Sequence, residues 1–413
     1  MSKKEIDTKA YETGFAQRDA RAIEPFEFVL SCVLASTIEA KRGFASVWRV
    51  FGAATGQDTA RSAITQRFGE GSAKLMQAVF EQVVERLPEE ERPPELLGKL
   101  EQFEDVLSHD GSVLALSPLL NKLFPPTRTN SVAAAAKLHA TADLVGRRIT
   151  AVELTGERHS ELDVAWDEPA VVGALYIDDL GYYSHDYFAV TVDAGSHFLS
   201  RLKTSSNPTV VEVYHGVRCP KASVGMRFKD IVFTQSHSTF DLKARFATKE
   251  NGPRDFRIVG VYNEETGEYH HYVTDLPPED FSAEEIAELY RLRWVIELLF
   301  KILKSFCHLD HVDTKDPDAL RTHVYASLIA SLVMQALLVS SAQAAGIHPS
   351  DISQLTVAAA APLIAMPLLI LWLDIDLTRE RLSQMILQII LVGCRDQNPG
   401  RRRKQQRARL SKE

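Results

Sequence analysis

Four polar residues that could bind or transfer phosphate fall within one short segment. Tyr290, Arg293, Glu297 and Lys304 stand among apolar residues in the stretch 290–304. On a single helix turning about 100° per residue, these four side chains would share an arc of about 60°. The apolar residues would fill the opposite arc, leaving a carboxylate exposed between two cations and a phenol. Most amphipathic helices simply expose such charges to water, so the segment alone does not establish a site.

Two aspartates at the ends of expected strands supply further carboxylates. Asp110 precedes a strand expected at Ser112–Leu116, and Asp179 follows a strand expected at Ala174–Ile177. Either aspartate alone would be interpreted as a turn residue. Together with Glu297 they make a set suited to two-metal phosphoryl chemistry, because Mg²⁺ prefers oxygen ligands from carboxylates, water and phosphate.

The stretch 290–304 resembles the Tyr-Arg-Glu-Lys signature of insertion-sequence DDE transposases, written Y-x2-R-x3-E-x6-K, and matches it at all four positions. The Asp-Gly-Ser segment at Asp110 and the Asp-x-Gly-Tyr segment at Asp179 are also similar to that family. Weaker similarities occur at Thr127–Asn130, Lys137–His139 and Phe198–Lys203. The resemblance covers roughly half of the chain, from about residue 105 to residue 310.

The resemblance implies an α/β chain with an RNase H-like core, a mixed five-stranded sheet flanked by helices. The first aspartate would lie on the central strand, the second just after the fourth strand, and the glutamate on a later helix. A β-strand-rich insertion would separate the second aspartate from the glutamate. Helical N- and C-terminal regions would flank this core.

The resemblance also implies the catalytic residues and their cofactor. Asp110, Asp179 and Glu297 would hold Mg²⁺ or Mn²⁺, as two ions, and would be the catalytic acids. Asp178 is a competitor for the second position, since neighbouring strand residues point to opposite sides. The Asp-x-Gly-Tyr spacing selects Asp179, and Asp178 would then be an outward or supporting residue.

The remaining signature residues are expected to bind DNA. Tyr290, Arg293 and Lys304 would contact phosphate near the cut. Trp294 would stack on an unpaired base, although a buried anchor is an equally plausible role. The implied partners are double-stranded DNA, both transposon ends and target, and a second copy of the chain in a synaptic homodimer. No membrane partner is expected.

Hydrophobic periodicity divides the chain into five regions. A helical region, 1–105, is expected to bind DNA, with a weak helix-turn-helix pattern in which Asp58 or Thr59 caps a second helix exposing Arg61, Gln66 and Arg67. The other four regions are 106–204, the first part of the catalytic core; 205–280, the β-rich insertion, including a strand at Met226–Thr234; 281–312, the second part of the core; and 313–413, a helical region with a basic tail.

Composition limits the class of protein. The formal net charge is −8, but the tail at 401–409 is strongly basic, and it is either a solvated end or a DNA-contacting arm. Four dispersed cysteines and an N-terminus without an apolar signal segment favour a cytoplasmic, nucleoid-associated protein. Two apolar stretches, Ala326–Ala345 and Val357–Leu373, are expected to be buried helices of a soluble domain.

Other functions are compatible with parts of this pattern. A nuclease on the same fold would share the metal site without strand transfer. A sequence-specific DNA-binding protein would need only the N-terminal helices. A membrane protein would use the apolar stretches at 326–373. An inactive transposase copy is disfavoured because all three acids are present.

Overall fold

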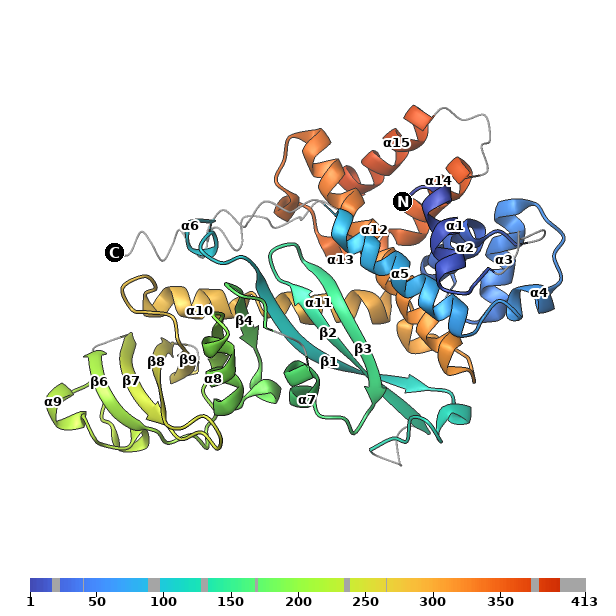
Figure 1. Cartoon of the computed structure of the whole chain (residues 1–413). Coiled ribbons are helices and arrows are strands. Elements are labelled where there is room, and N and C mark those ends of the chain that lie inside the picture. The colour runs from blue at the N-terminus through green and yellow to red at the C-terminus, as the bar shows by residue number, and fades with distance from the viewer. Residues whose placement is uncertain are drawn as a thin grey trace. The chain divides into compact units, whose positions relative to one another are not determined.

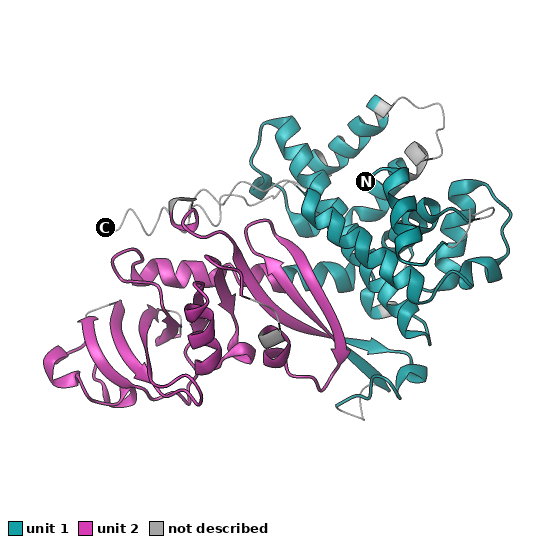
Figure 2. Cartoon of the chain, in the orientation of Figure 1, with its two compact units in different colours: residues 1–90, 114–136, 298–413 teal, residues 91–113, 137–297 magenta. Residues whose placement is uncertain are grey.

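The chain folds into two compact units that are interleaved in sequence (Figure 2). The helical unit comprises residues 1–90, 114–136 and 298–413, and the sheet unit comprises residues 91–113 and 137–297. The computed structural model describes residues 1–16, 23–39, 41–87, 97–127, 133–167, 170–233, 238–264, 266–372 and 379–393. The basic tail at 401–409 and the charged stretch 88–94 lie outside the described residues.

One mixed sheet of nine strands organises the sheet unit (Figure 1). Its order is β3-β2-β1-β4-β5-β9-β8-β7-β6. The strands are β1 (Val106–Leu116), β2 (Ala134–Asp143), β3 (Arg148–Gly156), β4 (Leu175–Asp178), β5 (His197–Arg201), β6 (Thr209–His215), β7 (Thr239–Phe246), β8 (Arg254–Asn263) and β9 (Glu268–Thr274).

Among the first five strands, β1, β4 and β5 run parallel to one another. β4 pairs with β1 and with β5 in parallel, and all four of its residues are buried. A short, continuously apolar strand is typical of a position covered on both faces. The helix α8 (His185–Asp193) connects β4 to β5, beginning at Ser184, whose hydroxyl accepts from Tyr187 N.

The expectation of a five-stranded sheet was wrong in its extent. β9 pairs antiparallel with β5, and β8, β7 and β6 follow in order, so the strand-rich block continues the same sheet. This pairing satisfies the backbone groups that β5 would otherwise expose at an edge.

The strand expected at Met226–Thr234 was also wrong. The described part of that segment contains a 3₁₀ turn, η3 (Phe228–Asp230). The amide of Asn207 accepts from Lys229 N, and Phe228 and Ile231 are both buried. A hydrogen bond to the side chain of Asn207 and two buried apolar residues therefore hold this segment in place of strand pairing.

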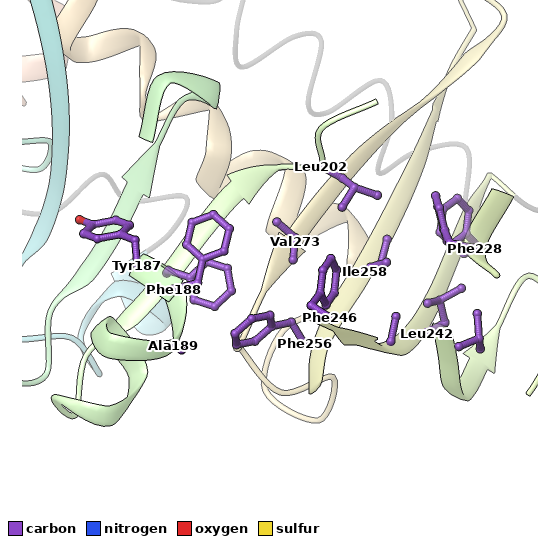
Figure 3. Packing of buried hydrophobic residues seen from close by; sticks show 14 of the residues in the cluster. Tyr187, Phe188, Ala189, Leu202, Phe228, Leu242, Phe246, Phe256, Ile258 and Val273 are labelled. Carbon is purple, nitrogen blue, oxygen red and sulfur yellow. The ribbon is translucent and has the colours of Figure 1, made fainter. Parts of the chain in front are cut away.

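An aromatic cluster joins α8 to the strands (Figure 3). Phe188 of α8 stacks on Phe198 of β5 with ring centroids 4.2 Å apart, and Phe256 of β8 meets Phe198 edge-on at 5.0 Å. Buried aromatic pairs in these geometries add stability beyond their buried area. The cluster therefore fixes α8 on the sheet and, with it, the end of β4.

The helical unit is built around a long helix, α12 (Pro317–Ala345), which packs on α5 and α2. Its other helices are α1 (Lys3–Glu12), α2 (Pro25–Ile38), α3 (Phe44–Thr55), α4 (Arg61–Thr65), α5 (Glu70–Arg86), α13 (Gln354–Ala359), α14 (Ala361–Trp372) and α15 (Arg379–Gln388). By length and composition α12 could cross a membrane, but 67% of its most apolar window is buried inside the protein.

A buried arginine ties the N-terminal helices to the C-terminal ones. Arg42 donates to the carbonyls of Cys307, at 3.2 Å, and His323, at 2.9 Å, and to the hydroxyl of Ser327. Burial lowers the pKa of this guanidinium to about 10. Segments more than 260 residues apart in sequence are thus held together by backbone carbonyls.

The expected helix-turn-helix was wrong in its second helix. α4 has only five residues, and its N-cap is Ala60 rather than Asp58 or Thr59. α3 ends at Thr55, and the capping residue Gly56 adopts the left-handed conformation. Arg67 lies over the ring of Phe15, 5.7 Å from its centroid. A helix this short does not have the length of a DNA-recognition helix.

Candidate active site

Asp110 lies within β1 rather than before its first residue, where the sequence placed it. The strand begins at Val106, four residues before Asp110, because residues 106–109 are buried and Val106 and Leu107 pair with β4. Asp110 is half-buried, and its carboxylate accepts a 2.7 Å hydrogen bond from Gly111 N. Within the first five strands β1 is the central one, which is where the resemblance places the first aspartate.

Asp179 directly follows β4 and begins a 3₁₀ turn, η2 (Leu180–Tyr182). Its carboxylate accepts from Gly181 N at 2.7 Å. Because β1 and β4 are adjacent and parallel, the side chain is held near that of Asp110.

Asp178 has a different environment from Asp179. It is 3% exposed and accepts from His109 N at 2.8 Å, with the His109 ring nitrogen Nδ1 at 3.4 Å. The His109 ring stacks on Tyr176 at 5.3 Å. The contact between His109 and Asp178 therefore links β1 to β4. Because each of these residues directly precedes a candidate acid, the contact also positions Asp110 and Asp179.

The signature segment is not one continuous helix. α10 (Ala283–Arg291) opens with a capping box of Ser282 and Glu285, which the local sequence Ser-Ala-Glu-Glu predicts, and ends at Arg291. α11 (Trp294–Ser305) begins after a two-residue turn. Tyr290 therefore belongs to α10, whereas Glu297 and Lys304 belong to α11, and the single arc predicted from sequence was wrong in this detail.

Arg293 occupies the turn and contacts two of the other signature residues. Its Nη2 donates to Glu297 Oε1, and its guanidinium carbon lies 5.9 Å from the centre of the Tyr290 ring. Burial raises the pKa of Tyr290 to about 12, and the ring packs on Tyr272 with centroids 5.3 Å apart. Tyr290, Arg293 and Glu297 are therefore brought together despite the break.

Trp294 and Lys304 lie on α11 in different surroundings. Trp294 is 61% exposed, so it is not the buried anchor that sequence reasoning left open. Lys304 belongs to the helical unit, where its ammonium lies 4.0 Å from Asp310 Oδ1.

In the folded protein, negative charge on Asp110 and on Asp179 is energetically unfavourable. Burial raises the pKa of Asp110 to about 7, with a further contribution from Asp179 and an opposing one from Arg293. Burial also raises the pKa of Asp179, against the Gly181 hydrogen bond and the positive charge of Arg293. Groups whose pKa values are displaced in this way, by burial and by each other, concentrate at functional sites.

A fourth acid, Glu161, faces these aspartates and was missed by sequence reasoning. It is the first residue of α7 (Glu161–Asp167) and lies 3.3 Å from Lys137 Nζ. Its charge raises the pKa of Asp110 and of Asp179. The sequence signal was slight: an acid opening a helix between the third and fourth strands, far from any recognised motif.

The donor set suits a hard divalent cation. Among the described residues, no three His, Cys, Asp or Glu side chains lie close enough to hold one metal ion. Mg²⁺, however, is usually bound through one or two carboxylates, with water and substrate phosphate completing its shell. Asp110 and Asp179 supply two such carboxylates, and their mutual repulsion is what a bound cation would relieve.

Comparison with known proteins identifies relatives among bacterial transposases. The chain is 38% identical over 85 residues to the putative transposase of insertion sequence element IS186A from Escherichia coli strain K12, covering 21% of this chain and 23% of that protein. It is 23% identical over 367 residues to the transposase of element IS231C from Bacillus thuringiensis subsp. berliner, covering 79% and 76%. The chain thus spans about a quarter of the length of the Escherichia coli relative.

A solved structure and a family also match. A piggyBac transposase synaptic complex with hairpin DNA aligns over 94% of this chain and 82% of that one, with 10% identity and a TM-score of 0.47. The transposase DDE domain family matches residues 101–333, which contain all three candidate acids. That match covers more than half of the chain, and the protein belongs to the DDE-domain transposase family.

Proposed function

We propose that this protein is a DNA transposase that cuts phosphodiester bonds at the ends of an insertion sequence and joins those ends to target DNA. Its catalytic acids in this proposal are Asp110, Asp179 and Glu297. The observation that carries it is the pair Asp110, on β1, and Asp179, directly after the adjacent parallel strand β4, whose charges interact inside the region matched by the DDE family.

Membership of the family implies the use of a divalent metal ion. We propose that the ions are Mg²⁺ or Mn²⁺, two in number, held by the three carboxylates. When bound they would activate water or a 3′-hydroxyl and stabilise the leaving oxygen. The chain's contribution is to hold Asp110 and Asp179 side by side, through the bond between Asp178 and His109, before any ion arrives.

Arg293 has a double role in this proposal. It pairs with Glu297 when DNA is absent, and a guanidinium with five N–H donors can also bind a phosphate oxygen. Together with Tyr290 it would place the scissile phosphate beside the acids. Lys304, two turns beyond Glu297 in sequence on α11, would contact the same backbone.

Trp294 is the proposed contact for an unpaired base. An exposed aromatic ring beside the signature turn supports this role, since base stacking on such rings is favourable and tolerant of sequence. The wider proposal includes an RNase H-like core, double-stranded DNA as the substrate and a homodimer that brings two transposon ends together.

A nuclease without strand transfer is the main alternative, and a DNA-binding protein without catalysis would not require the interacting acids. The purified protein should be incubated with Mg²⁺, a DNA fragment carrying both sequences that flank its reading frame, and a supercoiled target plasmid. We expect fragment ends joined to the plasmid. Cleaved fragments without joined products would favour the nuclease, and uncut DNA would contradict both enzymes.

A further inference from the structure

The carboxylate of Glu161 lies over the two glycines that adjoin the aspartates. A Cβ atom placed on Gly111 would come within 2.7 Å of Glu161 Oε1, and one placed on Gly181 would come within 2.5 Å of Glu161 Oε2. Gly111 follows Asp110 directly, and Gly181 donates to the carboxylate of Asp179. The glycines thus leave the space that the Glu161 carboxylate occupies, between β1 and the turn after β4.

The side chains around both glycines lie close to the glycine Cα atoms. The Cβ on Gly181 would also lie 2.9 Å from Asp179 Oδ1, and the Cβ on Gly111 would lie 3.2 Å from Lys137 Cδ. Neither glycine has a positive φ, so backbone freedom does not require it. A side chain at either position would instead displace the flexible end of Glu161 from the place it occupies beside the aspartates.

Lys137 is the counter-ion of this fourth acid. Its ammonium lies 3.3 Å from Glu161 Oε1 and donates to the carbonyl of His159 at 3.2 Å. Both side chains are mostly buried, with 15% of the lysine side chain and 27% of the glutamate side chain exposed. A lysine held in this way offsets one negative charge while no cation is bound.

We infer that Glu161 is a fourth carboxylate of the metal centre, which faces the ion bound by Asp110 and Asp179 through one of that ion's waters. This inference rests on the proposed function. Glu297 pairs with Arg293, whereas the Glu161 carboxylate lies over the glycines that adjoin both aspartates. Lys137 and the cation compete for the same carboxylate.

Mn²⁺ binding to the full-length protein without DNA tests this inference independently of catalysis. Free Mn²⁺ is followed by its electron paramagnetic resonance signal at pH 8 and low salt. Glu161→Gln keeps the shape of the side chain and should weaken binding about tenfold, the loss typical of a supporting group at a metal site. Asp163→Asn, an exposed acid two residues along α7, removes the same charge and should bind as the wild type does.

Lys137→Gln gives an effect of opposite sign. Removing the competing ammonium should tighten Mn²⁺ binding, and this gain should vanish in the double variant with Glu161→Gln. Since one variant weakens and the other strengthens binding, loss of folding cannot produce both results.

The outcomes separate this inference from the proposed function. Unchanged affinity in Glu161→Gln, with binding lost in Asp110→Asn, would overturn the role of Glu161 and leave the proposed function intact. Wild-type protein that binds no Mn²⁺, or binding that survives Asp110→Asn, would overturn the proposed metal site and this inference with it.

Discussion

The raised pKa of Asp110 predicts that its charge destabilises the metal-free protein above neutral pH. Burial moves this pKa from an ordinary 3.8 to about 7. Each unit of pKa difference between the folded and unfolded states corresponds to about 1.4 kcal/mol, so the full shift would amount to roughly 4 kcal/mol. Because the side chain is only partly enclosed, we expect about half of that, near 2 kcal/mol.

The direction of this pH dependence follows from which state, folded or unfolded, holds the Asp110 proton more tightly. Well below pH 3.8 both states are protonated and the wild type retains its full stability. Between pH 4 and 7 the unfolded chain has lost the proton while the folded protein still holds it, so the free energy of unfolding falls as pH rises. Asp110→Asn carries no charge at any pH and should not show this loss.

Urea unfolding in a metal-chelating buffer, from pH 4.5 to pH 8, measures the effect. The free energy of unfolding of Asp110→Asn minus that of the wild type should grow from pH 4.5 to pH 8, where it should reach about 2 kcal/mol. Asp105→Asn, an exposed acid just before β1, is the matched control and should show no such pH-dependent gain. Parallel pH profiles for the wild type and Asp110→Asn would refute the reasoning.

Three further predictions concern the supporting residues and the tail. Asp178→Asn should lower stability, because His109 loses its charged partner, but should retain DNA cleavage. Asp179→Asn should abolish cleavage and keep the fold. The reverse result in cleavage and unfolding assays would move the second acid to Asp178. Arg293→Lys keeps the charge but not the planar donor group, so its cleavage rate at saturating DNA should fall by orders of magnitude. Its stability should change by less than about 1 kcal/mol. Wild-type cleavage by this variant would remove the phosphate-positioning role. Deleting 398–413 removes seven Lys and Arg residues and should flatten the salt dependence of duplex binding by several units of slope; an unchanged slope would show that the tail does not contact DNA.

Local sequence patterns predicted the elements that local interactions determine. The capping box at Ser282 and Glu285 is formed, and the apolar run before Asp178 is a buried strand. Asp179 follows that strand at the position that the Asp-x-Gly-Tyr spacing selects. In these places a few neighbouring residues decide the backbone conformation.

Features that depend on distant residues were not predictable in the same way. The turn at Arg293 divides a segment whose apolar periodicity is continuous, so the pattern carried no sign of the break. Glu161 reaches the site only through the folded position of α7, the helix that follows β3 in sequence. No motif connects Glu161 with Gly111 or Gly181. The pairing of β9 with β5 likewise joins segments about 70 residues apart.

The central claim is that Asp110, Asp179 and Glu297 act together in metal-dependent cleavage. The most direct measurement is the single-turnover rate of cutting, with Mg²⁺, on a DNA duplex carrying the end sequence that flanks the reading frame. Asp110→Asn, Asp179→Asn and Glu297→Gln should each reduce this rate at least about a thousandfold while still binding the duplex, because each amide keeps the shape but loses the charge that holds the ion. A rate within tenfold of wild type for any of the three would contradict the assignment of that acid to the catalytic centre.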